Sequence, residues 1–167
     1  MPDVCDLILD DHETLRRRFA ELDEHREASG EVLAARWSPL ADLLELHAAT
    51  EEEVFYPRLL DTGTQAEDET DDAISDHNKI RDAVRRAAGA RAGTVDWWQA
   101  VKDAREANSD HMAEEERGAL ADLRAHDTPD DRLRLGDEWV AFAAEHAGMR
   151  GLRAEDRDPE EYIEQNS

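Results

Sequence analysis

A histidine followed four residues later by a glutamate occurs twice in the chain, each time within a stretch of apolar residues at helical spacing. The two pairs are His47–Glu51 and His111–Glu115. On an α-helix, residues i and i+4 lie about 40° apart around the axis and about 6 Å apart along it, so both side chains point the same way. The feature therefore requires two helices whose polar pairs face a common interior.

A lone histidine precedes each pair and also lies in an apolar stripe. His12 precedes the first pair and His77 the second, and Asp11-His12 corresponds to Asp76-His77 at an offset of 65 residues, against 64 for the two pairs. Each half of the chain therefore holds a helix with a core histidine, followed by a helix with a His-x3-Glu pair. Two such halves predict an all-α fold, an up-down four-helix bundle with a pseudo-twofold internal repeat.

Capping residues, apolar periodicity and helix breakers set the expected helices. They span residues 4–28, 39–60, 70–91 and 95–125, with a fifth helical segment at about 130–148 that packs outside the bundle. Ser38-Pro39 is expected to begin the second helix after a short helical piece at 31–36, Pro57 to kink or end it, and residues 61–69 to form a polar loop. The predicted domain covers residues 1–150, with its bundle core at 4–125, and an acidic, flexible tail follows at 151–167.

Helical-wheel positions predict which side chains accompany the first pair. Glu51 shares the face of His47, whereas Glu52 and Glu53 turn away from it toward solvent. Tyr56 lies about 180° from His47, which places it away from the pair. The remaining histidines, His25, His126 and His146, are expected outside the bundle interior, and Cys5 in the core.

Charge and composition exclude several kinds of partner. The net charge is −23, so nucleic acid and anionic membranes are not expected to bind. No stretch approaches the roughly 18 apolar residues of a membrane span, and the first residues lack the basic and apolar regions of a signal peptide. A single cysteine forms no internal disulfide. These features predict a soluble cytoplasmic protein.

Six polar residues lie in the apolar stripes of the four predicted helices: His12, His47, Glu51, His77, His111 and Glu115. Buried imidazoles and carboxylates cost free energy unless they are paired, and a shared metal ion pairs them all. We expect a dinuclear centre in which His12 and His47 hold one ion, His77 and His111 hold the other, and the two glutamates bridge. Mixed nitrogen and oxygen ligands suit iron, manganese or zinc.

These residues, together with the run Glu-Glu-Glu-Val-Phe-Tyr-Pro that begins at Glu51, resemble a hemerythrin-like (HHE cation-binding) domain over residues 4–125. The resemblance implies an up-down four-helix bundle and a non-haem di-iron centre with two iron ions, oxo- or hydroxo-bridged, for which manganese or zinc could substitute. It also implies activities among reversible oxygen binding, oxygen or redox sensing, iron handling, and reactions with peroxide or nitric oxide.

One difference from the oxygen-carrying hemerythrins reduces the number of activities expected for this chain. Those proteins have a fifth histidine one turn from the histidine of the third helix, where this chain has Ala73 and Arg81. The departure favours reaction with, or sensing of, oxygen, peroxide or nitric oxide over reversible oxygen carriage.

Three alternative functions make different demands on these residues. A non-enzymatic bundle that stores iron, or binds a partner in a metal-dependent way, stays open, whereas a metal-free bundle would bury four histidines without a partner. A ferritin-like carboxylate enzyme needs Glu-x2-His pairs, which are absent.

Overall fold

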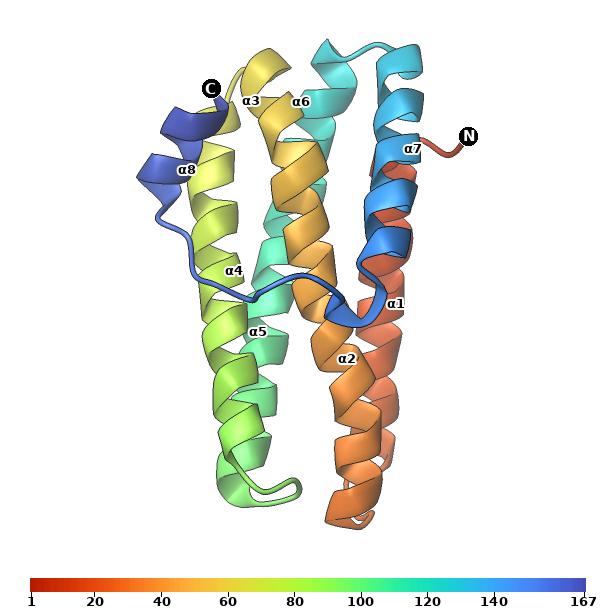
Figure 1. The fold of residues 1–167 in the computed structure, drawn as a ribbon, viewed down its shortest axis with the longest axis vertical. Coiled ribbons are helices and arrows are strands. Elements are labelled where there is room, and N and C mark those ends of the chain that lie inside the picture. Colours follow the sequence, from red (N-terminus) through yellow and green to blue (C-terminus); the bar gives the residue numbers. More distant parts are fainter.

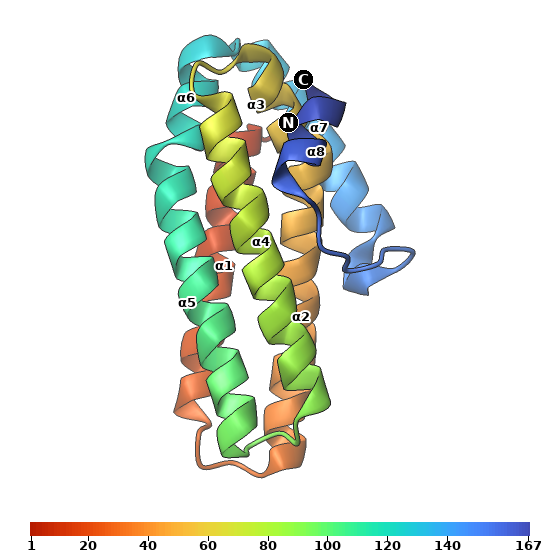
Figure 2. The same cartoon turned by 90° about the vertical axis from the view of Figure 1, so that its left-hand side faces the viewer.

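Four long helices run up and down along one axis in the computed structural model, which describes all of residues 1–167 (Figure 1). They are α1 (Val4–Glu24), α2 (Gly30–Thr50), α4 (Ala66–Gly89) and α5 (Val95–Arg117). A view turned by 90° shows the same elongated bundle, with short connections at its lower end (Figure 2). The predicted all-α four-helix bundle is confirmed.

Side-chain caps begin three of these helices. Asp3 accepts from the backbone N–H of Cys5, and Thr94 accepts from that of Trp97, as expected for the first and fourth helices. Ser29 caps α2 by accepting from the N–H of Val32. Each cap satisfies a backbone donor that has no partner within the helix.

The start of the second helix differs from the prediction. Helix α2 begins at Gly30 and continues through Pro39, so Ser38-Pro39 is not its start. Proline removes one backbone hydrogen bond from a helix interior, which costs stability. Packing opposes that cost, because the two turns before Pro39 bury Leu33 and Trp37, and the Trp37 ring lies 6.3 Å from that of Phe19.

The first His-x3-Glu helix changes geometry at its glutamate, and the second changes three residues after its own. After α2 the chain forms a π-helical turn, η1 (Glu51–Phe55), and continues as α3 (Tyr56–Thr62). After α5 it breaks at Gly118 and continues as α6 (Ala119–His126). The expected helices therefore end near the predicted positions but are interrupted, and α4 begins within the predicted loop at 61–69.

The hydrophobic core consists of two clusters, one on either side of the polar residues along the bundle axis. Leu15, Leu44 and Ile80 belong to the cluster that also contains Trp37 and Trp97. The second cluster contains Ile8, Val54, Ile74, Phe55 and Leu120. The lone histidines His12 and His77 each lie between members of the two clusters on their own helix, which places the polar site in an apolar surround.

The C-terminal part adds two helices to the bundle. The predicted fifth helix is α7 (Pro129–Glu145), which packs against α1 and α2 and is followed by a short turn, η2 (Ala147–Met149). The chain then crosses the bundle surface and ends in α8 (Pro159–Asn166) beside α4 (Figure 1). None of the helices is both long enough and apolar enough to cross a membrane.

The segment expected to be a flexible tail contains the helix α8, which packs against the bundle. Tyr162 of α8 is only 3% exposed, and its hydroxyl donates to the backbone carbonyl of Glu52. Asp158 caps this helix by accepting from the N–H of Glu161. A single buried aromatic gives little periodic signal in an acidic segment, so this packing is not visible in the sequence pattern.

Candidate metal centre

The six residues singled out in the sequence come together in the middle of the bundle. His12 comes from α1, His47 from the end of α2 and Glu51 from the start of η1. Helix α4 supplies His77, and α5 supplies both His111 and Glu115. No member of this set is more than 3% exposed. Their charge and hydrogen-bonding capacity must therefore be satisfied inside the protein.

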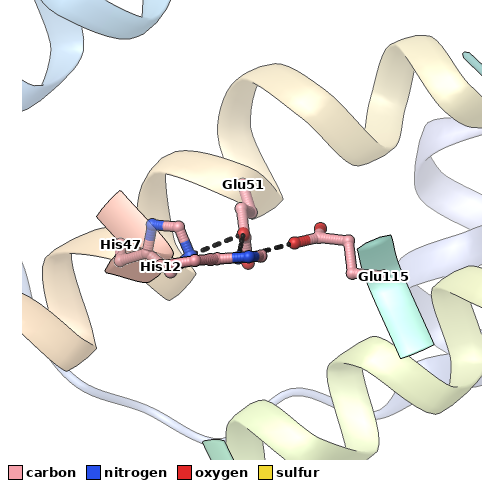
Figure 3. Close-up of side chains that lie close together, drawn as sticks. All are labelled: His12, His47, Glu51 and Glu115. Atoms are coloured by element: carbon pink, nitrogen blue, oxygen red, sulfur yellow. Dashed lines mark ion pairs between the residues drawn. The ribbon is translucent and has the colours of Figure 1, made fainter. Parts of the chain in front are cut away.

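These side chains form two donor groups. The first contains His12, His47, Glu51 and Glu115 (Figure 3), and the second contains Glu51, His77 and His111. Within each group, one ligand atom from every residue lies within 4.8 Å of the others. Such clustering of imidazole nitrogens and carboxylate oxygens is the arrangement that a bound transition metal requires.

Glu51 belongs to both groups because its two oxygens point to different histidines. Oε1 lies 2.8 Å from Nε2 of His47, while Oε2 lies 2.9 Å from Nε2 of His77 and 3.2 Å from Nε2 of His111. Glu115 was expected to bridge in the same way, but its Oε2 lies 3.1 Å from His12 Nε2 and 4.0 Å from His111 Nε2. Glu115 is therefore placed mainly with the first group.

The first group contains buried atoms that make no hydrogen bond. These atoms are Nε2 of His12, Nε2 of His47, Oε1 of Glu51 and Oε2 of Glu115. Their short separations are ion-pair contacts without hydrogen-bond geometry, and buried polar atoms left in this way are costly and rare. A cation among them would satisfy all of these atoms at once. The residues present therefore fit a metal ion with nitrogen and oxygen ligands.

A second layer of carboxylates lies behind three of the four histidines. Each of these histidines places its other ring nitrogen, Nδ1, against a carboxylate oxygen. The pairs are His12 with Glu116 at 2.8 Å, His47 with Asp11 at 3.2 Å, and His77 with Glu52 at 2.8 Å. A carboxylate in this position orients the ring and directs Nε2 toward a metal. Only the folded bundle reveals these pairs, because each joins residues from different helices.

Two residues near the first pair were placed wrongly by the helical wheel. Glu52 was expected in solvent but is 3% exposed, and Tyr56 was expected away from the site but donates its hydroxyl to Glu115 Oε1 at 2.7 Å. Both lie in or directly after the π-helical turn η1. Because a π turn closes its hydrogen bond at i+5 rather than i+4, each following side chain is rotated from the position that a 100° wheel assigns.

Ionisation of the cluster is set by burial and by the mutual attraction of its members. Burial acts to lower the pKa of His77, but hydrogen bonds to Glu51 and Glu52 raise that pKa to about 9. Burial likewise opposes charge on His47, yet Glu51 and Asp11 hold its pKa well above 6.5. Burial acts to raise the pKa of Glu51, whereas His47 and His111 bring it well below 4.5. In the metal-free protein, His47 and His77 therefore hold protons at neutral pH.

Metal uptake by the metal-free protein is therefore expected to release protons near pH 7. An imidazole must be deprotonated to bind a metal, and His77 keeps its proton below about pH 9. The apparent metal affinity should then rise as the pH is raised from 6.5 toward 9. Titration with Zn²⁺ in weakly buffered solution containing a pH indicator measures this release. Uptake without any acidification would contradict the protonated cluster.

The other histidines and the cysteine lie outside both donor groups. His25 and His126 each direct Nδ1 to a backbone carbonyl four residues earlier, and His146 directs Nδ1 to the carbonyl of Arg150. Cys5 is fully buried in the core, where burial raises the pKa of its thiol to about 12. The thiol is therefore protonated and apolar in character, and it supplies no soft ligand to the cluster.

The residues one turn before and one turn after His77, Ala73 and Arg81, occupy different amounts of space near the candidate centre. Arg81 is buried and donates to Glu52 at 2.8 Å, which directs its guanidinium away from the donor groups. Ala73 lines a cavity of about 240 Å³ that also touches Tyr56, His111 and Glu115. A small side chain at this position leaves open space beside the cluster.

The fold is a helical bundle, and its buried imidazoles and carboxylates fit a metal ion. These two features define the class of protein as a metal-binding helical bundle. The model of the Hemerythrin HHE cation binding domain matches residues 3–123 of this chain. The chain belongs to the hemerythrin HHE cation-binding domain family. Comparisons with curated proteins and with solved structures gave no match.

Proposed function

We propose that this protein binds two non-haem iron ions, one at each donor group, and that it reacts with or senses oxygen, peroxide or nitric oxide. The strongest support for this proposal is the position of the Glu51 carboxylate. One of its oxygens faces His47, and the other faces His77 and His111. Iron bound among such ligands supplies one-electron redox chemistry toward small oxygen- and nitrogen-containing molecules.

The proposed small-molecule ligand reaches the cluster through the cavity beside Ala73. That cavity touches His111 and Glu115, and the second donor group contains one residue fewer than the first. A cavity of about 240 Å³ holds a diatomic molecule or a peroxide but is small for a larger organic substrate. This combination supports a reaction or sensing role for a small ligand.

The chain's own residues hold and orient the site. Glu52 and Glu116 orient the rings of His77 and His12 through their Nδ1 atoms. Burial and the neighbouring Glu115 carboxylate raise the pKa of Tyr56 well above 10, so its hydroxyl keeps its proton. That hydroxyl is a hydrogen-bond donor at the wall of the cavity, directed to Glu115 Oε1.

The second candidate is a non-enzymatic bundle that stores iron or binds a partner in a metal-dependent way. The near-complete burial of all six donor residues favours it, because such burial holds ions in place and restricts exchange with solvent. The two functions differ in whether the iron-loaded protein responds to a small molecule, either by consuming it or by a change in its spectrum.

Anaerobic reconstitution of the metal-free protein with Fe²⁺ tests both functions. We expect two irons per chain, ferric absorption bands on exposure to air, and consumption of peroxide or nitric oxide by the loaded protein. Full loading without consumption or a spectral response would favour storage or partner binding. One iron or none per chain would contradict the dinuclear centre.

A matched pair of histidine variants localises the binding. His111→Ala removes a buried donor of the second group and is expected to lower the iron content to about one per chain. His126→Ala removes an exposed histidine outside both groups and should leave two. Equal loading of the two variants would contradict the assignment of His111.

A further inference from the structure

The cavity beside the candidate metal centre has an acidic mouth. Tyr56, His111 and Glu115 form its inner wall. Toward solvent the lining includes Glu69, Asp72 and Glu114, together with one basic residue, Arg117. The lining residues at the mouth come from α4, from the end of α5 and from the start of α6, and Figure 2 shows α4 and α5 side by side. A charged molecule that approaches the centre by this route first meets carboxylates.

Two further surface hollows extend this acidic mouth. Both share Asp72 with the cavity, and one of them also shares Glu114. Their other acidic members are Glu67, Asp68, Asp71, Asp76 and Asp110. We call the acidic residues at the mouth and in the two hollows the acidic funnel. Its negative charge is concentrated at the opening that leads to the donor residues.

Few cations neutralise the acidic funnel. Asp76 is its one member with an ion-pair partner, Lys79 at 2.7 Å. Lys79 and Arg117 are the basic residues that line the cavity and the two hollows. Carboxylates crowded in this way repel one another, and that repulsion opposes folding unless a cation relieves it.

Unpartnered buried oxygens lie on the path that leads inward from the funnel. The Glu115 side chain is 1% exposed, and its Oε2 makes no hydrogen bond. Nearer the mouth, Glu69 Oε2 is likewise buried without a partner. A Cβ at Gly118 would come within 2.8 Å of Glu69 Oε1, so the glycine makes room for this carboxylate. Oxygen atoms of this kind attract a cation rather than an anion.

We propose that the acidic funnel and its cavity form the route by which divalent metal ions reach the two donor groups. The proposal rests on the metal binding proposed above and adds how the ion is selected and delivered. A concave patch of one charge raises the local concentration of oppositely charged ions and accelerates their association. The Glu69 carboxylate would then replace water that the ion loses on its way to His111 and Glu115.

Stopped-flow mixing of the metal-free protein with Co²⁺, followed by the visible absorption of the bound ion, measures this delivery. The test variant is the double substitution Asp72→Asn and Glu114→Gln, which removes two charges at the mouth. We expect it to slow association by about tenfold at low ionic strength. The difference should shrink toward zero near 1 M salt, where the Debye length is about 3 Å. The final number of bound ions should stay that of the unmodified protein.

The control is the double substitution Asp137→Asn and Glu138→Gln on α7, which makes the same change in net charge at exposed positions away from α4 and α5. It should load cobalt at the rate of the unmodified protein. Equal rates in all three proteins, or equal slowing in both variants, would overturn the funnel while leaving metal binding intact. Failure of the unmodified protein to bind cobalt at all would instead overturn the proposed metal centre and the funnel with it.

Discussion

Replacing Glu51 by alanine is expected to abolish tight binding at both donor groups. Glu51 is the one residue common to the two groups, with one carboxylate oxygen facing His47 and the other facing His77 and His111. Loss of a residue that only supports a ligand weakens metal affinity by about 10–100-fold, so loss of a shared ligand should cost at least about 100-fold at each group. Iron content after reconstitution and desalting measures the effect.

Three further variants make the Glu51 result specific. Glu53→Ala removes an exposed carboxylate two positions away and should retain full metal content. Glu115→Ala should weaken mainly the first group, because Glu115 lies closer to His12 than to His111. Glu51→Gln keeps the side-chain volume and checks that any loss is not a failure to fold. Full loading of Glu51→Ala would refute a carboxylate shared between the two ions.

Replacing Glu52 by alanine should cause a large loss of folding stability. Its Oε1 accepts hydrogen bonds from Arg81 and His77, each at 2.8 Å, and both partners are at least 97% buried. Removing one member of a buried charged pair leaves the other charge without compensation, which costs about 3–5 kcal/mol. The free energy of unfolding of the metal-free protein, measured by urea denaturation, should fall by that amount.

The neighbouring position again supplies the control for Glu52. Glu53→Ala changes the same side chain in a solvent-exposed position, and surface changes of this kind usually alter stability by less than about 0.5 kcal/mol. Glu52→Ala should also weaken metal binding on the His77 side, since it removes the Nδ1 partner that orients the ring. Equal stabilities of the two variants would mean that Glu52 lies in solvent, as the helical wheel placed it.

Helical periodicity was enough to predict the helical class, the repeat and the residues of the candidate centre. These properties follow from the period of the α-helix, because residues three or four apart must share a face wherever the helix is regular. His12 and His77 could be assigned to the core in this way, and so could the pairing of His47 with Glu51. The structure places these residues in the bundle interior, where the apolar stripes predicted them.

The surroundings of these residues depend on helix packing and could not be predicted from the periodicity. The π-helical turn carries Glu52 and Tyr56 inward, and a regular helical period cannot anticipate such a turn. The support of Glu52 comes from far along the chain, since Arg157 Nε lies 2.8 Å from its Oε2 and Tyr162 of α8 donates to its backbone carbonyl. Contacts between segments so distant in sequence depend on how the helices pack, and that packing leaves no period in the sequence.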